Sequence, residues 1–337
     1  MKKVIKRIGL GLLILVGMLF IIILILYHNV IMTMLSVKQV GNVQPIYQEK
    51  IYGNCYFNTY MESNIRSSKE LTNFLTHNMG YGLLCNIDSS HGCSAFFAKT
   101  PEGDILLCND VDHNPANRTP VVMEAEILGK KTIGFTDMVS FTDNINDGFY
   151  NRILMYMMPY TMLSGFNEDG LAVGIAAAKG SYQDPIEGKP FIFDNTIPQL
   201  VLSNASNVEE AITFLEKYNI GAGNFRSHYM LVDSTGNCAI VEWNGDMKVF
   251  YPEKDYLIMS NFPIYYMTGF GKDRYENYVE ALDECNGILT EEEAMKLLKA
   301  NRIKGDEFVS VVYNLTQKTA RMYFDKPDME ILYSFTD

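Results

Sequence analysis

Short apolar runs separated by turn-forming residues divide most of this chain into segments of strand length. The clearest example lies between residues 91 and 113, where apolar runs at 94–99 and 105–108 flank a turn at 101–104. Two such runs joined by a short turn that contains glycine predict a β-hairpin. Gly92 and Cys93 stand at the front of this hairpin, and Asp112 stands just past its far end.

The same pattern continues to the C-terminus. It predicts further strands at residues 121–128, 132–135, 171–178, 228–233, 238–243, 247–251, 256–259, 308–313 and 320–324, with a turn at 244–246. Successive hairpins with helices between them are typical of antiparallel sheets covered by helices, and not of a doubly wound parallel sheet. We therefore expect an α+β fold.

The sequence predicts three helices that follow capping residues. The first covers residues 68–75, with Ser67 or Ser68 as its N-cap. The other two follow capping boxes, namely 208–218 after Ser206 and Glu209, and 294–302 after Thr290 and Glu293. The segment 149–162 is rich in Met and Tyr and is interrupted by Pro159. Because methionine adapts to irregular apolar shapes, this segment fits either the lining of an acyl pocket or ordinary core.

The N-terminus carries a different pattern. Lys2, Lys3, Lys6 and Arg7 precede an uncharged apolar run from Ile8 to Tyr27, and the next basic residue is Lys38. A helix of about 20 residues spans a hydrocarbon core of about 30 Å, and the positive-inside rule places its basic end in the cytoplasm. A cleaved signal peptide is the alternative, although the residues after Tyr27 offer no small-x-small cleavage site. We expect a retained single-pass anchor in the cell membrane, with the rest of the chain extracytoplasmic.

Composition narrows the function classes. The 337 residues carry a formal net charge of −12, which argues against a nucleic-acid partner because such a partner requires a basic face. Six cysteines without a CxxC pair give no disulfide framework of the small secreted kind.

Cys93 is the candidate nucleophile. A thiol needs a base, and of the five histidines only His113 and His228 lie downstream of the hairpin start, neither in a sequence that favours a papain-like pair. The other base is the α-amino group of the cysteine itself, with an ordinary pKa of about 7.7 to 8.0. This solution requires cleavage of the Gly92–Cys93 bond, and a glycine before the cysteine permits strained geometry and leaves its carbonyl open to attack.

These motifs resemble the choloylglycine hydrolase superfamily of linear amide C–N hydrolases, which are N-terminal-nucleophile (Ntn) enzymes and include bile salt hydrolase, penicillin V acylase and acid-ceramidase-like amidases. The resemblance runs from about Phe74 to the C-terminus. The family pattern has Gly-Arg-Asn-x-Asp with its Asp nineteen places after the Cys, as Asp112 is after Cys93. The family's Asn-Glu-Lys-Gly-Leu motif is similar to residues 167–171, and its Thr-Asn-x-Pro motif is similar to residues 260–263. Its late arginine, at the start of a helix, corresponds to Arg274 within residues 273–275.

The resemblance implies an Ntn αββα sandwich and four catalytic residues. Cys93 would be the nucleophile and, through its amine, the base; Asp112 would orient that amine. Asn261 would donate its amide N–H to the tetrahedral oxyanion, and Arg274 would supply positive charge near the thiolate. The substrate would be a small N-acyl amide, with no cofactor and no metal.

Two departures from the family pattern bear on activity. Asn109 stands where the family has Arg, and Asp110 adds a negative charge nearby, so both changes are expected to raise the thiol pKa. Arg118 is a possible substitute cation. Ala177 falls where bile salt hydrolases have a polar residue, so bile-salt specificity is not expected. Asn109, Asn167 and Ala177 are the candidate substrate-binding positions.

Three alternatives stay open at this stage. Cys93 alone would be an ordinary buried cysteine. The second alternative is a metal site, because five potential ligands lie close in sequence, namely Cys85, His91, Cys93, Cys108 and His113. Their spacing matches no usual zinc pattern. The third alternative is a catalytically degenerate member that keeps the fold as a binding or structural domain.

The sequence predicts three parts. Residues 1–30 form a basic tip and membrane anchor, residues 31–92 form a prosegment or linker, and residues 93–337 form the catalytic domain.

Overall fold

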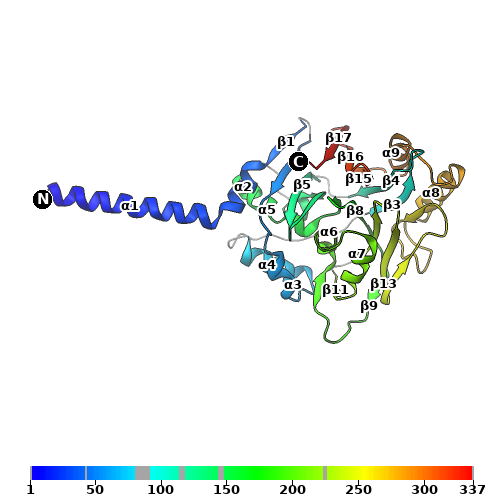
Figure 1. Ribbon diagram of the computed structural model, residues 1–337, viewed down its shortest axis with the longest axis horizontal. Helices are drawn as coiled ribbons and strands as arrows, with labels where there is room; N and C mark the ends of the chain where they lie inside the picture. Colours follow the sequence, from blue (N-terminus) through cyan, green and yellow to red (C-terminus); the bar gives the residue numbers. More distant parts are fainter. Residues whose placement is uncertain are drawn as a thin grey trace.

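Two large sheets pack face to face, and helices cover the outer face of each (Figure 1). The computed structural model describes residues 2–41, 44–79, 92–113, 118–142, 148–222 and 226–335, with the side chains of residues 2–7 left out. The four layers run helix, sheet, sheet, helix. The predicted α+β sandwich is confirmed.

The first sheet has nine strands in the order β1-β2-β5-β6-β7-β8-β12-β13-β9. Their bounds are β1 Lys38–Val40, β2 Ile46–Ile51, β5 Pro120–Ile127, β6 Lys130–Asp137, β7 Ser164–Asn167, β8 Leu171–Ala177, β12 Ser227–Asp233, β13 Cys238–Phe250 and β9 Tyr182–Gln183. Most neighbours are antiparallel, but β2 lies parallel to β5 and β9 lies parallel to β13.

The second sheet has six strands in the order β14-β3-β4-β15-β16-β17, all antiparallel. Their bounds are β14 Leu257–Met259, β3 Gly92–Lys99, β4 Ile105–Asp112, β15 Glu307–Asn314, β16 Thr319–Phe324 and β17 Met329–Ser334. A separate parallel pair consists of β10 Phe191–Phe193 and β11 Asn219–Gly221.

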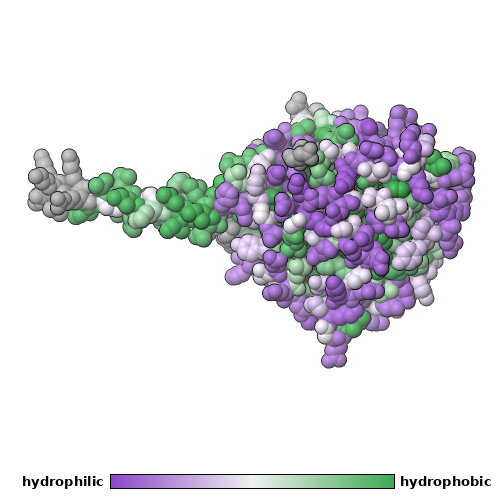
Figure 2. Space-filling view, in the orientation of Figure 1, coloured by the Kyte–Doolittle hydropathy of each residue, from purple (hydrophilic) through white to green (hydrophobic). Residues whose placement is uncertain are grey.

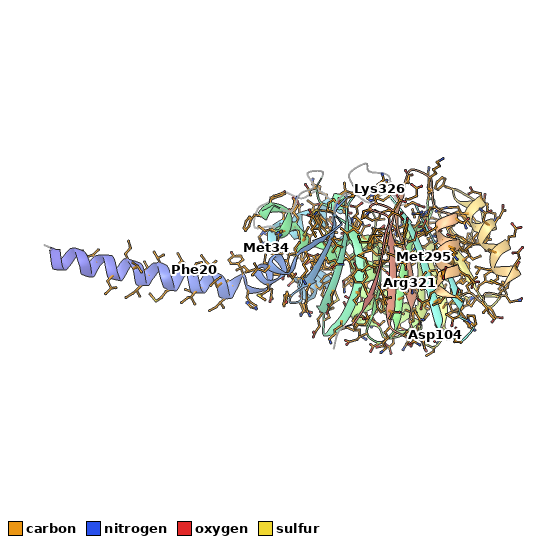
Figure 3. The ribbon with its side chains drawn as sticks, turned by 90° about the horizontal axis from the view of Figure 1, so that it is seen from above. Phe20, Met34, Asp104, Met295, Arg321 and Lys326 are labelled. Atoms are coloured by element: carbon orange, nitrogen blue, oxygen red, sulfur yellow. The ribbon has the colours of Figure 1, made fainter. Side chains whose placement is uncertain are left out.

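The helices divide between the two outer faces and the N-terminal segment. Their bounds are α1 Lys2–Leu26, α2 His28–Ser36, α3 Phe57–Glu62, α4 Ser68–Asn78, α5 Phe149–Met155, α6 Ile197–Asn204, α7 Val208–Leu215, α8 Lys272–Glu284 and α9 Glu291–Ala300, with 3-10 turns η1 Met138–Ser140, η2 Met158–Thr161 and η3 Asp194–Thr196. The first sheet contacts α6 and α7, and the second contacts α8 and α9. In Figure 3, Met295 of α9 lies on the side of the strands away from α1.

The hydrophobic core lies between the sheets, where β3 and β4 contact β8 and β12. Alternation along β3 sends Cys93, Ala95 and Phe97 into this core, whereas Phe96 and Ala98 face a second cluster beneath α8 and α9. The Met- and Tyr-rich segment 149–162 forms α5 and η2, and its methionines are buried. The residues from Leu154 onward pack mainly in the hydrophobic core, whereas Phe149 and Tyr150 are exposed.

The segment before Cys93 is part of the main sheet. Strand β2 pairs with β5 over five residues, and Tyr60 of α3 accepts a hydrogen bond from the backbone N–H of Phe193 at 2.8 Å. The Tyr160 hydroxyl donates to the Cys55 carbonyl at 2.7 Å. These contacts join residues 38–79 to the rest of the fold at several places.

Helix α1 projects from the globular body, and the side chains of Ile8–Leu26 are exposed (Figures 1 and 2). Within the described residues, one span, Ile8–Leu26, is long and apolar enough to cross a membrane. Its length, its composition and its place near the N-terminus fit a membrane span and also fit a signal sequence.

Two local predictions differ from the structure. The expected turn at 244–246 is wrong, because β13 continues through it and Asn244 and Gly245 pair with β9. The cap of α7 is Asn207, which accepts from the N–H of Glu210, and not Ser206. The capping box predicted at Thr290 and Glu293 is confirmed.

Candidate active site

The hairpin of β3 and β4 places Cys93 beside Asp112. Gly92 pairs with Asp112 and Cys93 pairs with Val111, at the end of the hairpin opposite its turn. Both side chains are fully buried. Because of strand alternation, Cys93 faces the core between the sheets, whereas Asp112 faces α8.

Asn261 and Arg274 reach this end of the hairpin from elsewhere in the chain. Asn261 follows β14, which pairs with β3, and Arg274 lies in the first turn of α8. The backbone N–H of Cys93 donates to Asn261 Oδ1 at 3.1 Å. Arg274 donates to Asp112 Oδ2 at 2.7 Å, to the Cys93 carbonyl at 3.2 Å, and to Asn261 Oδ1. The four predicted catalytic residues therefore form one buried cluster.

Charge around the thiol comes from both sides. Burial raises the pKa of the Cys93 thiol well above its ordinary value, the carboxylate of Asp112 raises it further, and the guanidinium of Arg274 lowers it. Burial also raises the pKa of Asp112 to about 6, while Arg274 and the N–H of Ile303 oppose that shift. The cysteine of the intact chain is thus a neutral thiol at pH 7, and needs a base before it can attack.

Gly92 lies close to the side chain of Ile303. A Cβ at this position would lie 2.8 Å from Cδ1 of Ile303 and 3.6 Å from Cβ of Asp112. Its φ does not fall in the left-handed region that favours glycine. The close approach of Ile303, whose N–H donates to Asp112 Oδ1 at 3.1 Å, had no sequence signal.

Asn109 and Asp110, which depart from the family pattern, lie side by side in strand β4 of the hairpin. Asn109 is buried and donates to the Ser94 carbonyl at 2.9 Å, and its Oδ1 has no hydrogen-bond partner within the described residues. Asp110 Oδ1 accepts from Ser310 at 2.7 Å, and burial raises the pKa of Asp110 well above its ordinary value. Negative charge on Asp110 is one of the causes that raise the pKa of the Cys93 thiol, as the sequence predicts.

Arg118 does not replace the missing cation. Its guanidinium donates to the backbone carbonyls of His113 and Gly305, at 2.7 Å and 3.2 Å. Arg274 is the cation that acts on the Cys93 thiol.

The other two candidate substrate-binding residues lie at opposite ends of β8. The Ala177 carbonyl accepts from Asn261 Nδ2 at 3.4 Å, so its backbone meets the site. Asn167 precedes the start of β8, about 20 Å away at the rise of a strand. Its Nδ2 donates to the Leu202 and Ala205 carbonyls, and its Oδ1 accepts from the N–H of Leu171. Asn167 holds a turn, and the structure does not bring it to Cys93.

The two downstream histidines are engaged with carboxylates. His113 Nδ1 lies 2.5 Å from Asp137 Oδ2, and His228 Nδ1 lies 3.2 Å from Glu242 Oε2. Cys93 and Cys108 face opposite sides of the sheet, which argues against a shared metal, while Cys85 and His91 lie outside the described residues.

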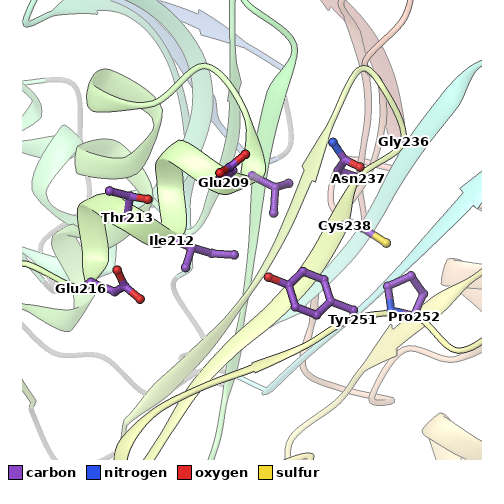
Figure 4. Close-up of a pocket in the computed structure, with 10 residues that line it drawn as sticks. Glu209, Ile212, Thr213, Glu216, Gly236, Asn237, Cys238, Tyr251 and Pro252 are labelled. Atoms are coloured by element: carbon purple, nitrogen blue, oxygen red, sulfur yellow. The ribbon is translucent and has the colours of Figure 1, made fainter.

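A pocket lies elsewhere, between α7 and the start of β13 (Figure 4). Its volume is about 590 Å³, and Glu209, Cys238 and Tyr251 are among the residues that line it. Gly236 at its edge approaches Ile105, which opens β4. Seven residues of strand, about 23 Å, separate Ile105 from Asp112. This pocket is not the site around Cys93.

Comparison with known proteins identifies the family. The model of the acyl-coenzyme A:6-aminopenicillanic acid acyl-transferase family matches residues 135–328, more than half of the chain. The chain belongs to this acyl-transferase family. The matched segment contains Asn261 and Arg274, whereas Cys93 and Asp112 precede it.

Solved structures share the fold of this family member. A variant of conjugated bile acid hydrolase from Clostridium perfringens is 14% identical, with a TM-score of 0.54 over 72% of this chain and 92% of that one. Penicillin V acylase from Agrobacterium tumefaciens is 16% identical, with a TM-score of 0.54 over 73% and 87%.

An N-acylethanolamine-hydrolyzing acid amidase ortholog from Caenorhabditis elegans is 14% identical, with a TM-score of 0.47 over 66% and 93%. A comparison with curated proteins found no match. The predicted Ntn fold and superfamily are confirmed, and the names of the family and neighbours are those of enzymes, as predicted.

Proposed function

We propose that this chain is a membrane-anchored, extracytoplasmic Ntn cysteine amidase. It cleaves its own Gly92–Cys93 bond and then hydrolyses a linear C–N amide bond of a small N-acyl substrate. The observation that carries the proposal is the buried cluster in which the backbone nitrogen of Cys93 meets Asn261, with Arg274 bridging Asn261 and Asp112. After cleavage that nitrogen becomes an amine, which is the base that the thiol lacks.

The reaction follows from these positions. The α-amine accepts the thiol proton, and the thiolate adds to the substrate carbonyl. Asn261 Nδ2, which donates to Ala177 in the intact chain, donates to the oxyanion. The C–N bond breaks as the ammonium of Cys93 gives its proton to the leaving amine, and the acyl group remains on sulfur as a thioester. Water, activated by the same amine, then hydrolyses the thioester to a carboxylic acid and the free thiol.

Asp112 and Arg274 set the charge balance of this cycle. Asp112 accepts from Arg274 and from the N–H of Ile303, and it lies across the strand pair from Gly92. Its carboxylate would orient the ammonium that forms on Cys93. Arg274, held by that carboxylate, would lower the pKa of the thiol. Each residue acts on a different charge of the reacting cysteine.

The anchoring and location rest on the first forty residues. The apolar span Ile8–Leu26 is exposed along its whole length, and its basic end is at the N-terminus. A single-pass anchor with the N-terminus in the cytoplasm places the body outside the cell membrane.

A degenerate, non-enzymatic member is the second candidate, and Asn109 in place of Arg is the observation that favours it. An amide-substrate screen distinguishes the two candidates. Purified protein is incubated with a panel of N-acyl amines that differ in acyl length, with and without an added amine acceptor, since the family is named for acyl transfer. We expect turnover by the native protein, none by Cys93→Ala, and about a 10²- to 10³-fold lower kcat for Asn261→Ala. Equal release by native protein and Cys93→Ala would reject the proposal.

A further inference from the structure

Two buried polar side chains of the first sheet hold the loop that carries Asn261. In the antiparallel pair of β12 and β13, Tyr229 lies opposite Val241. His228 comes just before Tyr229, Glu242 comes just after Val241, and both are completely buried. His228 also pairs across the sheet with Ala176, next to the Ala177 carbonyl that Asn261 contacts. The proposed reaction uses neither side chain.

Both side chains contact the backbone on the two sides of Asn261. His228 Nε2 lies 2.7 Å from the Ser260 carbonyl oxygen. The N–H of Ile264 donates to Glu242 Oε2 at 2.8 Å, and the N–H of Tyr265 donates to Glu242 Oε1 at 2.8 Å. The loop is therefore fixed one residue before Asn261 and again three and four residues after it.

The two side chains and the loop form one hydrogen-bonded network. Nδ1 of His228 faces Glu242 Oε2, and Nε2 donates to the Ser260 carbonyl, which can only accept. Each carboxyl oxygen of Glu242 accepts one backbone N–H of the loop. Loss of either side chain therefore leaves a buried polar group of this network without its partner.

We propose that His228 and Glu242 are positioning residues for Asn261. They hold Ser260 to Tyr265 so that the Asn261 amide stays aimed at the reacting carbonyl beside Cys93. The inference rests on the proposed function and adds to it. Asn261 extends from a loop, and an oxyanion donor requires a fixed position, because a displacement of about 1 Å can cost about 10²-fold in rate.

The test compares His228→Gln, Glu242→Gln and the double variant. Each single variant removes one member of a buried hydrogen-bonded pair, whereas the double variant replaces both members by amides and guards against loss of the fold. We expect all three to lower kcat at least about tenfold with little change in KM, since a displaced donor weakens transition-state binding. We also expect the double variant to lose no more than either single variant, because the two residues act as one unit.

Asp233→Asn is the matched control. Asp233 is a buried carboxylate at the other end of β12, where it accepts from the backbone N–H of Val208 and of Thr235. This change likewise replaces a buried carboxylate by an amide and removes charge-assisted contacts. We expect it to leave kcat unchanged even where it lowers Tm.

Amide hydrogen exchange separates this inference from the proposed function. We expect faster exchange at Ile264 and Tyr265 in the three variants and unchanged exchange there in Asp233→Asn, whether or not the native protein has amidase activity. If exchange is faster in the variants but the native protein has no activity, the result supports positioning of the loop by His228 and Glu242 and rejects the proposed amidase function. Unchanged exchange, or a kcat as high as that of the native protein, would overturn the positioning function.

Discussion

At the residue scale, Asp110 and Asp112 lie two residues apart on β4 in different surroundings. Burial raises the pKa of Asp110 well above its ordinary value and Ser310 donates to it, whereas Asp112 pairs with Arg274. We predict that Asp110→Asn, which is a neutral residue of the same shape, retains cleavage before Cys93 and changes Tm little. Asp112→Asn should abolish cleavage and lose about 3–5 kcal/mol of stability, because it leaves Arg274 buried without its partner.

Intact mass and thermal unfolding of the two variants check this prediction. Equal loss of cleavage in both would contradict the assignment of different functions to the two carboxyl groups.

Asn109 is the second test at this scale. Its Cγ lies 3.3 Å from the position of a Cβ on Gly174, and the side chain is enclosed in the core between the sheets. We predict that Asn109→Arg lowers Tm by several degrees and gives no gain in kcat, since it buries a larger, charged side chain. Restored or increased turnover at an unchanged Tm would instead identify Asn109 as a catalytic defect.

Much of the candidate site could be predicted from the sequence, because its motifs occur in the same order as in the family that the chain resembles. The hairpin pattern indicates Cys93 and Asp112, and the family resemblance adds Asn261 and Arg274. All four side chains meet in space. The close approach of Ile303 and the pair formed by His228 and Glu242 had no such signal, since contacts between distant strands leave no local pattern.

At the element scale, hairpins were predicted well and long-range pairing was not. The strands around residues 101–104 have local partners, so their apolar runs predict them, although each strand is longer than expected. Strand β2 was missed because its partner β5 lies about 75 residues away and parallel to it. The turn expected at Gly245 was overridden by pairing with β9.

The place of β2 in the sheet predicts the fate of the segment before Cys93. Backbone hydrogen bonds to β5 and buried contacts through Tyr60 are independent of the Gly92–Cys93 bond. We predict that the two chains stay together after cleavage, and that the catalytic part sediments with membranes even after a high-salt wash. The measurement is fractionation followed by immunoblotting, with Cys93→Ala as the uncleaved control. Residues 93–337 in the soluble fraction would contradict this prediction.

At the scale of the whole molecule, several buried carboxyl groups bind protons more tightly in the folded state. Burial raises the pKa of Asp112 to about 6 and that of Asp194 to about 7, and it also raises the pKa of Glu49 and Asp110. A raised carboxyl pKa adds stability that is complete below about pH 4 and is lost as the pH rises through the folded value. We therefore predict a Tm that falls between pH 5 and pH 8.

Thermal unfolding of the Cys93→Ala protein across this range checks the sign without interference from cleavage. Each kcal/mol lost lowers Tm by roughly 2–4 °C in domains of about 150–250 residues. Asp194→Asn should reduce the slope between about pH 6 and pH 8. A Tm that rises toward pH 8 would contradict the protonation states assigned to these groups.

The central claim is that Cys93 becomes an N-terminal nucleophile, and N-terminal sequencing with intact mass of the purified protein tests it most directly. After incubation at neutral and mildly acidic pH, we expect a new chain that begins at Cys93, and only the intact chain for Cys93→Ala. An intact native chain at both pH values, with a Cys93 that resists thiol reagents, would contradict the account.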